Sequence, residues 1–377
     1  MTERASYPAL TSARFAAAVV VVVFHVWRWG VWEAPPIVER FVAAGPIAVT
    51  FFFVLSGFLL TLTYTTQESM LTTTKVAFWR ARVARVLPVH WLGVLVAFPV
   101  ALALWKKAGA DPQAFGDVVK DGFFSLSLLQ AWIPGHELAI NPPAWSIGVE
   151  ALFYALFPFV APRLATTTKH PAGHPHPGAW PLLGLLWLVS VWPGIGYVLL
   201  DPDGLATGGV VVDRGTHAHY LDMLKYHPLV RLPELLMGVV VGGLFQRGLR
   251  VSAAGAAAAM AVVVVVVAAG VPYAILHNGL LAPAFAIVIV ALASAPSTSI
   301  LAARPLVRLG ESSYALYILH VPLLWWISGI GERRTGTKIL EQPAAAAAAV
   351  VVVVVVSVFV FMAFEDPLRR RLRGPKA

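Results

Sequence analysis

The sequence contains no cysteine among its 377 residues. This absence excludes disulfide bonds, thiolate nucleophiles and metal centres or clusters held by cysteine. Charged residues are also scarce, at 12% of the chain compared with about 25% in an ordinary soluble domain. So few charges cannot cover the surface of a globular protein, which excludes a soluble enzyme, a disordered protein and a nucleic-acid-binding module.

Hydrophobic residues make up 58% of the chain, and the mean hydropathy is +0.76. The apolar runs are unbroken, as in Val262 to Val267 and Val350 to Val356, whereas the strands of a transmembrane barrel alternate apolar and polar residues. The sequence therefore predicts an all-α polytopic membrane bundle. A span needs about 20 apolar residues, and ten segments qualify: 11–32, 45–64, 86–105, 144–164, 180–200, 228–246, 252–271, 278–296, 312–330 and 343–364. The shorter stretch from Phe123 to Ile133 predicts an interfacial or re-entrant segment.

These segments leave no room for a soluble domain, so we expect one membrane domain over 1–377, with a bundle at 11–364 and a basic tail at 365–377. No cleavable signal peptide is predicted, because no small-residue cleavage site follows the first span. The short, arginine-rich connections fall on one side if the N-terminus is cytoplasmic. We therefore expect a plasma-membrane protein with both termini in the cytoplasm. The net charge of +9 then reflects topology and attraction to anionic lipid, and no nucleic acid is expected.

Arg14 and His25 lie in the first span, and ionisable groups at membrane depth are functional candidates. Their eleven-residue separation places both side chains on one helix face, offset by about 20° and about 16 Å along the axis. Arg14 could alternatively be a headgroup anchor, and His25 an interfacial histidine beside Trp27 and Trp29. The shared face favours a joint functional role.

The second span contains Ser56-Gly57, which could simply permit close helix packing. We expect the connection after it to carry Arg80, Arg82 and Arg85 just before Pro88. This triplet is either a topology signal or a site for a phosphorylated ligand arriving from the cytoplasm, since arginine matches phosphate bidentately.

The fourth span opens at Asn141, a predicted helix N-cap, followed by Pro142 as the first helical residue. Ser146, Glu150 and Tyr154 then follow at intervals of four and form one polar stripe. A carboxylate this deep in a membrane helix needs a partner. Glu150 is therefore either half of a structural ion pair or a functional group.

Later segments carry further polar residues. Arg231 and Glu234, at i and i+3, predict a mutual salt bridge. Tyr317 and His320 share a face of the ninth span, where His320 is either a packing residue or a reactive one. Glu365-Asp366 could cap the last span or pair with the inner arginines. The histidines of two proline-broken or outer loops are not expected to bind metal; they are His170, His174, His176, His217 and His219.

Together these motifs resemble the acyltransferase-3 family of integral membrane O-acyltransferases. Arg14 and His25 reproduce its Arg-x10-His signature, and Phe51 to Leu60 looks like its Phe-Phe-Val-Leu-Ser-Gly-Phe-Leu segment. Arg82 to Pro88 is similar to its Arg-x-x-Arg with a following proline, although His90 stands where an aromatic residue is usual. Two further elements agree, at Ala144 to Glu150 and at Gly310 to His320. The five motifs occur in order over almost the whole chain.

The resemblance implies ten spans, acyl-CoA used from the cytoplasm, and transfer to a hydroxyl. Acceptors in the family include cell-surface glycans, lipid-linked sugars and macrolide-type natural products. Some members carry an extracytoplasmic hydrolase-like domain, which we do not expect in this chain. We therefore expect an acetyl or other short acyl group to be transferred within the membrane domain, with acyl-CoA as co-substrate and no permanently bound cofactor or metal.

Acylation of a hydroxyl needs a base near neutrality, and histidine suits that task. We expect His25 to deprotonate the acceptor and Glu150 to orient or balance His25, with Arg14 completing the catalytic group. Arg14, Arg82 and Arg85 are expected to bind the donor, and the substrate-binding residues to include Ser146, Tyr154, Tyr317 and His320. A serine or histidine acyl-enzyme stays open, and so does an alternative function, a secondary transporter or flippase with a His25–Glu150 proton relay.

Overall fold

The computed structural model describes residues 7–373 except 31, 68–69, 167–177 and 214, and these residues form helices and turns with one isolated β-bridge, between Thr65 and Leu71. The predicted all-α polytopic bundle is therefore confirmed. The long helices are α1 (Pro8–Gly30), α3 (Ile47–Tyr64), α4 (Lys75–Lys107), α6 (Trp145–Thr166), α7 (Ala179–Leu200), α9 (Pro228–Gln246), α14 (Ser313–Thr335) and α15 (Pro343–Val360). Shorter helices connect them: α2 (Pro36–Ala43), α5 (Pro112–Ser127), α8 (His219–Tyr226), α10 (Ala253–Ala268), α11 (Tyr273–Ile275), α12 (Ala282–Ala293), α13 (Arg304–Glu311) and α16 (Asp366–Arg373).

Eight helical segments of the described chain are long and apolar enough to cross a membrane. Two of the ten predicted spans differ from this pattern. The segment predicted at 252–271 is the 16-residue helix α10, about 24 Å long and so shorter than the hydrocarbon core of about 30 Å. The segment predicted at 278–296 belongs to a helix pair, Tyr273–Leu280 and Ala282–Ala293, which is bent by 40° and can count as a ninth span.

The break between α11 and α12 has a local cause. Asn278 and Gly279 leave helical geometry there, and Gly279 has a φ of +73°, a conformation that glycine adopts without the steric penalty of a Cβ. Pro283 then occupies the first turn of α12, where its missing N–H costs nothing. Sequence periodicity alone did not reveal this interruption.

Other boundaries also differ from the sequence predictions. Arg80, Arg82 and Arg85 lie within α4, not in a connection, because α4 begins at Lys75, where the Thr74 hydroxyl caps it by accepting a hydrogen bond from the Ala77 N–H (3.2 Å). The expected tail is helical as far as Arg373: α15 passes through a π-helical turn at Phe361–Glu365 into α16, which packs on α4.

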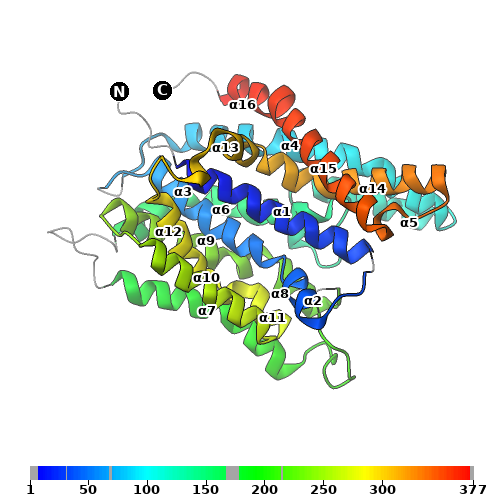
Figure 1. Ribbon diagram of the computed structural model, residues 1–377, viewed down its shortest axis with the longest axis horizontal. Helices are drawn as coiled ribbons and strands as arrows, with labels where there is room; N and C mark the ends of the chain where they lie inside the picture. The colour runs from blue at the N-terminus through cyan, green and yellow to red at the C-terminus, as the bar shows by residue number, and fades with distance from the viewer. Residues whose placement is uncertain (1–6, 31, 68–69, 167–177, 214, 374–377) are drawn as a thin grey trace.

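Helix α1 runs through the middle of the bundle (Figure 1), with α3, α9 and α12 on one side and α14 and α15 on the other. It packs against α3, α13, α14 and α15. The start of α1 and helix α16 lie at the same end of the bundle (Figure 1). Polar side chains of α1 can therefore face groups from both halves of the chain.

Among the described helices, α3 and α9 share the most extensive contact. A Cβ added at Gly57 would collide with the carbonyl oxygen of Leu235, and one added at Gly238 would collide with the carbonyl oxygen of Val54. Only glycine permits this approach, as in small-residue contacts between membrane helices. The structure therefore confirms the packing interpretation of Gly57.

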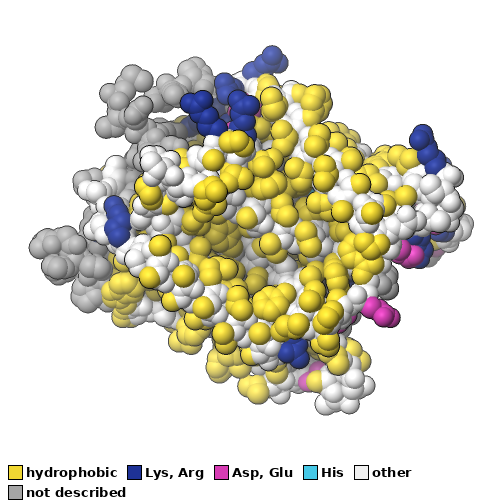
Figure 2. Space-filling view, viewed as in Figure 1, with side chains coloured by type: hydrophobic (Ala, Val, Ile, Leu, Met, Phe, Trp, Pro, Cys, Tyr) yellow, Lys and Arg dark blue, Asp and Glu magenta, His cyan; other side chains and the backbone are white. Residues whose placement is uncertain are grey.

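The outer surface is apolar over much of its area. Figure 2 shows hydrophobic side chains spread across one face, with most of the visible Lys and Arg near its edges. Large apolar side chains stand exposed on α7 and α15, among them Trp192 at 66% and Phe359 at 68%. Exposed apolar surface of this extent is costly in water and, together with the eight long apolar helices, indicates a multi-pass membrane protein.

Candidate active site

Two neighbouring cavities among the described residues are lined by most of the predicted site residues. The first has a volume of about 430 Å³ and is lined by α1, α3, α4, α6 and α14. Its charged lining residues are Arg14, Arg82, Arg85 and Glu150. Hydroxyl groups complete the polar lining, from Ser56, Tyr64, Ser146, Tyr154, Ser313, Tyr314 and Tyr317 among others. All three arginines predicted to bind the donor therefore line one space.

Glu150 is the acidic group of this first cavity. The hydroxyl of Tyr154, one helical turn later, donates a hydrogen bond to Glu150 Oε2 (2.6 Å). Arg14, Arg82 and Ser56 lie around the same carboxyl group. The predicted stripe of Ser146, Glu150 and Tyr154 thus lines one cavity, as i, i+4 and i+8 spacing on α6 requires.

Arg82 and Arg85 have defined partners on neighbouring helices. Arg82 Nη2 donates to the Tyr64 hydroxyl (2.8 Å), and its guanidinium lies 5.1 Å from the centre of that ring, within the range of a cation–π contact. Arg85 forms a salt bridge with Glu365, whose side chain is fully buried. The predicted pairing of the tail with the inner arginines therefore exists between Arg85 and Glu365.

Positive charge exceeds negative charge around the first cavity. Three guanidinium groups, of Arg14, Arg82 and Arg85, face two carboxyl groups, of Glu150 and Glu365. The excess remains whichever carboxyl groups are ionised, because arginine stays protonated in proteins. A net positive site among membrane helices attracts an anionic ligand.

The second cavity has a volume of about 280 Å³, and His25 is part of its wall. Aromatic side chains dominate the lining: Phe24, Trp29, Trp145, Tyr226, Tyr273, Tyr317 and Trp325. His277 also lines it and is stacked on Tyr273, with ring centres 5.3 Å apart. An aromatic chamber with a few polar groups is typical of a small-molecule site.

His25 on α1 contacts His320 on α14. The distance from His25 Nδ1 to His320 Nε2 is 3.2 Å, and the ring centres are 4.9 Å apart. His320 is fully buried, whereas His25 is half-buried. Because 295 residues separate the two histidines, no local sequence pattern indicated this contact.

Backbone carbonyls assign the proton positions on both rings. His320 Nδ1 lies 2.7 Å from the carbonyl oxygen of Tyr317, and His25 Nδ1 lies 2.9 Å from that of Val21. A carbonyl oxygen only accepts, so in the neutral rings we assign each Nδ1 as the protonated nitrogen. The Nδ1–H of His25 is then shared between the Val21 carbonyl and His320 Nε2, and His25 Nε2 is the unprotonated, basic nitrogen of that ring.

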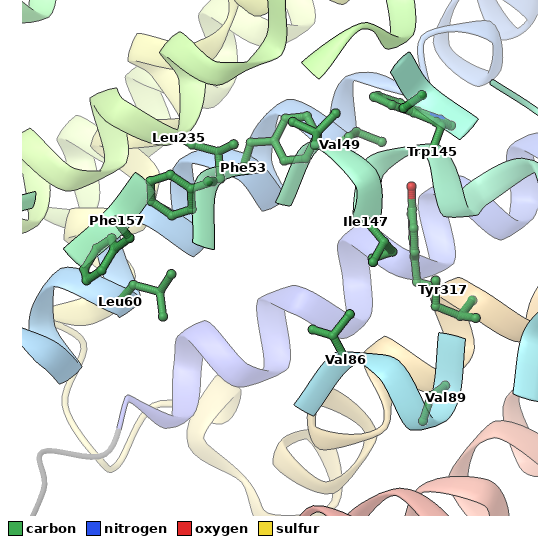
Figure 3. Packing of buried hydrophobic residues seen from close by; sticks show 14 of the residues in the cluster. Val49, Phe53, Leu60, Val86, Val89, Trp145, Ile147, Phe157, Leu235 and Tyr317 are labelled. Carbon is green, nitrogen blue, oxygen red and sulfur yellow. The ribbon is translucent and has the colours of Figure 1, made fainter. Parts of the chain in front are cut away.

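The two cavities share a wall. Val49 of α3 and Tyr317 of α14 line both. The Tyr317 hydroxyl and Ser146 Oγ are 3.0 Å apart, and Ser146 Oγ is also 3.1 Å from the carbonyl oxygen of Pro143. Ser146 has one proton, so it donates to Pro143 while Tyr317 donates to Ser146. Figure 3 shows the Tyr317 hydroxyl pointing toward the part of α6 that carries Trp145 and Ile147.

The structure does not place Glu150 beside His25. Glu150 lines the first cavity and His25 the second, and His320 lies at hydrogen-bond distance from His25. The expected orientation of His25 by Glu150 therefore has no counterpart in this geometry. Arg14 and His25 line different cavities because about 16 Å of α1 lies between them.

Several predicted polar residues have structural contacts. Arg231 forms the expected salt bridge with Glu234 (3.1 Å) and also donates to the His277 carbonyl and to Asn278 Oδ1 (2.9 Å), which ties α9 to the break between α11 and α12. His90 is buried, with Nε2 2.7 Å from the Ser125 carbonyl. Asn141 is the N-cap of a short 3-10 helix, Pro142–Ala144, as predicted, but its side chain makes no capping bond and donates to the carbonyl of Ile318 on α14 (3.0 Å).

Sequence reasoning missed two residues of these sites. Tyr273 and His277 line the second cavity, and the Leu276-His-Asn-Gly run at the helix break is the signal that could have indicated them. Glu365 was singled out only as a cap or partner at the chain end. His170, His174 and His176 lie outside the described residues.

Comparisons with known proteins agree on one chemistry. The model of a family described as an acyltransferase domain matches residues 7–362. A protein named acyltransferase MdmB, from Streptomyces mycarofaciens, is 28% identical over 330 residues, which are 83% of this chain and 78% of that relative. No solved structure matches the chain.

Proposed function

The chain belongs to the acyltransferase-3 family, and from this premise we propose that it is a membrane O-acyltransferase that moves an acetyl or other short acyl group from acyl-CoA to a hydroxyl. The acceptor is a cell-surface glycan, a lipid-linked sugar or a small natural product. One observation carries the proposal: His25, in contact with His320, lines a chamber that shares a wall with a positively charged cavity.

The charge of the first cavity supports a phosphorylated donor. Coenzyme A carries several phosphate charges, and guanidinium groups bind phosphate through paired, charge-assisted hydrogen bonds. Arg14 and Arg82 line the cavity, and Arg85 would exchange part of its contact with Glu365 for the ligand. The phosphates would stay near these arginines while the pantetheine arm reaches toward His25, about 16 Å further along α1.

The histidine pair supports general-base catalysis. His25 Nε2 takes the proton of the acceptor hydroxyl, and the oxygen attacks the thioester carbonyl carbon to form a tetrahedral intermediate. The C–S bond then breaks, the acyl C–O bond remains, and the leaving thiolate takes the proton from His25. His320 positions His25 by accepting its Nδ1–H, and this hydrogen bond strengthens when His25 is charged.

The proposed orientation of the protein in the membrane follows from the side on which acyl-CoA is available. Acyl-CoA is a cytoplasmic metabolite, so we place the arginine cavity toward the cytoplasm and both chain ends on that side. The basic helix α16, with Arg369, Arg370, Arg371 and Arg373, would then meet the anionic inner leaflet of the plasma membrane.

Purified protein in liposomes, incubated with acyl-labelled acyl-CoA and candidate acceptors, tests the proposal. Formation of an acylated acceptor with release of one CoA thiol per ester supports it. Movement of label into the vesicle lumen without transfer would instead favour the transporter alternative. His219→Gln is the matched control for substitutions of His25, because His219 is an exposed histidine of the connecting region.

A further inference from the structure

Few residues belong to the wall that the two cavities share, and these residues lie between the proposed donor site and His25. Among their described lining residues, the two cavities have Val49 and Tyr317 in common. Both are well buried, at 4% and 7% exposure. On the proposed function, on which this inference rests, donor phosphates bind on one side of this pair and the base stands on the other.

On that function, an acyl group that moves from the first cavity to His25 would cross the shared wall at Val49 and Tyr317. We infer that these two side chains form an aperture that limits the size of the acyl group delivered to the His25–His320 pair, and that they determine acyl-chain specificity. Val49 projects from the first turns of α3, and Tyr317 from α14 one turn before His320. The centres of the Tyr317 and His320 rings are 6.1 Å apart, so the aperture opens next to the reaction centre.

A hydrogen bond to Ser146 holds the ring of Tyr317 in place between the two cavities. Its hydroxyl donates to Ser146 on α6, and its ring packs edge-to-face on Phe52, with centres 5.8 Å apart. The ring contact is apolar and weak, whereas the hydrogen bond fixes the hydroxyl end. Loss of this hydrogen bond should let the Tyr317 ring rotate, so that the aperture admits larger acyl groups with little change in side-chain volume.

Transfer rates for acetyl-, butyryl- and hexanoyl-CoA with one acceptor test the aperture. The wild type should prefer acetyl. Val49→Ala should raise the hexanoyl-to-acetyl ratio of kcat/KM roughly tenfold or more, since one methylene in a fitted pocket discriminates by about 10- to 200-fold. Tyr317→Phe and Ser146→Ala should shift the ratio in the same direction, and the double variant should shift it no further than either single one, because both remove the same hydrogen bond.

Two matched truncations distinguish an effect of the aperture on acyl preference from an effect of cavity volume. Leu59 lines only the first cavity of the two, and Val21 only the second. Leu59→Ala and Val21→Ala should leave the acyl preference unchanged. A shift with Val21→Ala as large as that with Val49→Ala would overturn the inference, because chamber volume would then set the limit.

The absence of cysteine permits a graded version of the experiment. In V49C the single thiol can be converted to mixed disulfides with methyl, ethyl or propyl methanethiosulfonate. Larger adducts should exclude hexanoyl before butyryl and butyryl before acetyl, and dithiothreitol should restore transfer. Normal acetyl transfer with an acyl preference insensitive to every change at Val49 and Tyr317 refutes the aperture. No transfer from any acyl-CoA by the wild type refutes the proposed function instead.

Discussion

Replacement of His25 by glutamine should abolish acyl transfer while the protein still inserts and folds. Glutamine can make a hydrogen bond but cannot take a proton from the acceptor hydroxyl. Removal of a general base costs about 10²- to 10⁴-fold in rate. His25 is half-buried on a cavity wall, so the change should disturb packing little. His25→Ala should be equally inactive.

Loss of the contact between His25 and His320 should lower the rate of transfer less than loss of the base itself. His320 Nε2 accepts from His25 Nδ1 across 3.2 Å, and a hydrogen bond to a charged group contributes about 1.5–3 kcal/mol. His320→Leu removes it and should lower kcat about 10- to 100-fold. His320→Gln keeps an oxygen that can accept the same proton, so its loss should be smaller. The order of activity should be wild type, then His320→Gln, then His320→Leu, then His25→Gln.

The measurement is acyl transfer per mole of monodisperse protein, with His219→Gln as the control. Substantial activity in His25→Gln would refute the assignment of the base. A larger loss of activity at His320 than at His25 would instead assign the base to His320 on α14 and make His25 the positioning residue.

Three other variants or fusions test separate parts of the structure. Arg82→Ala should weaken donor affinity about 10- to 100-fold, the value of a charge-assisted hydrogen bond, and leave the KM for the acceptor unchanged; an unchanged donor affinity would make Arg82 only a topology signal. Gly238→Val should sharply reduce the yield of monodisperse protein, because its Cβ would meet the Val54 carbonyl and overpacking costs about 1–3 kcal/mol or more; Gly184→Val, where the space is open, is the control. A reporter fused after Ala377 should be active only if it works in the cytoplasm, and an extracytoplasmic signal would contradict the proposed orientation.

The sequence predicted the features that depend on local spacing. Long apolar runs predicted the bundle because the hydrocarbon core accepts only helices with satisfied backbones or closed barrels. Helical periodicity predicted the stripe of Ser146, Glu150 and Tyr154, and the same rule predicted the ion pair of Arg231 with Glu234. These predictions need no knowledge of which helices are neighbours.

Features that depend on helix neighbours could not be predicted in this way. The bond between Arg85 and Glu365 joins residues 280 positions apart. At the helix break of Asn278 and Gly279, Arg231 of α9 donates to the His277 carbonyl and to Asn278 Oδ1, a tertiary contact that the spacing of residues did not reveal. Helix α4 was shortened in the prediction because its first turns, rich in arginine, have the composition of a cytoplasmic connection.

The placement of Glu150 shows why two buried polar residues can be paired incorrectly from the sequence. Both Glu150 and His25 lie inside the bundle, and a carboxylate is the common partner of a catalytic histidine. Arg14 and Glu150, however, meet at one level of the bundle, where buried charges of opposite sign reduce each other's desolvation cost. His25 lies about three turns further along α1, beyond the wall of Val49 and Tyr317. At that level His25 contacts His320 and the carbonyl oxygen of Val21, which fix the position of its Nδ1–H and so assign Nε2 as the nitrogen that can take the proton of the acceptor.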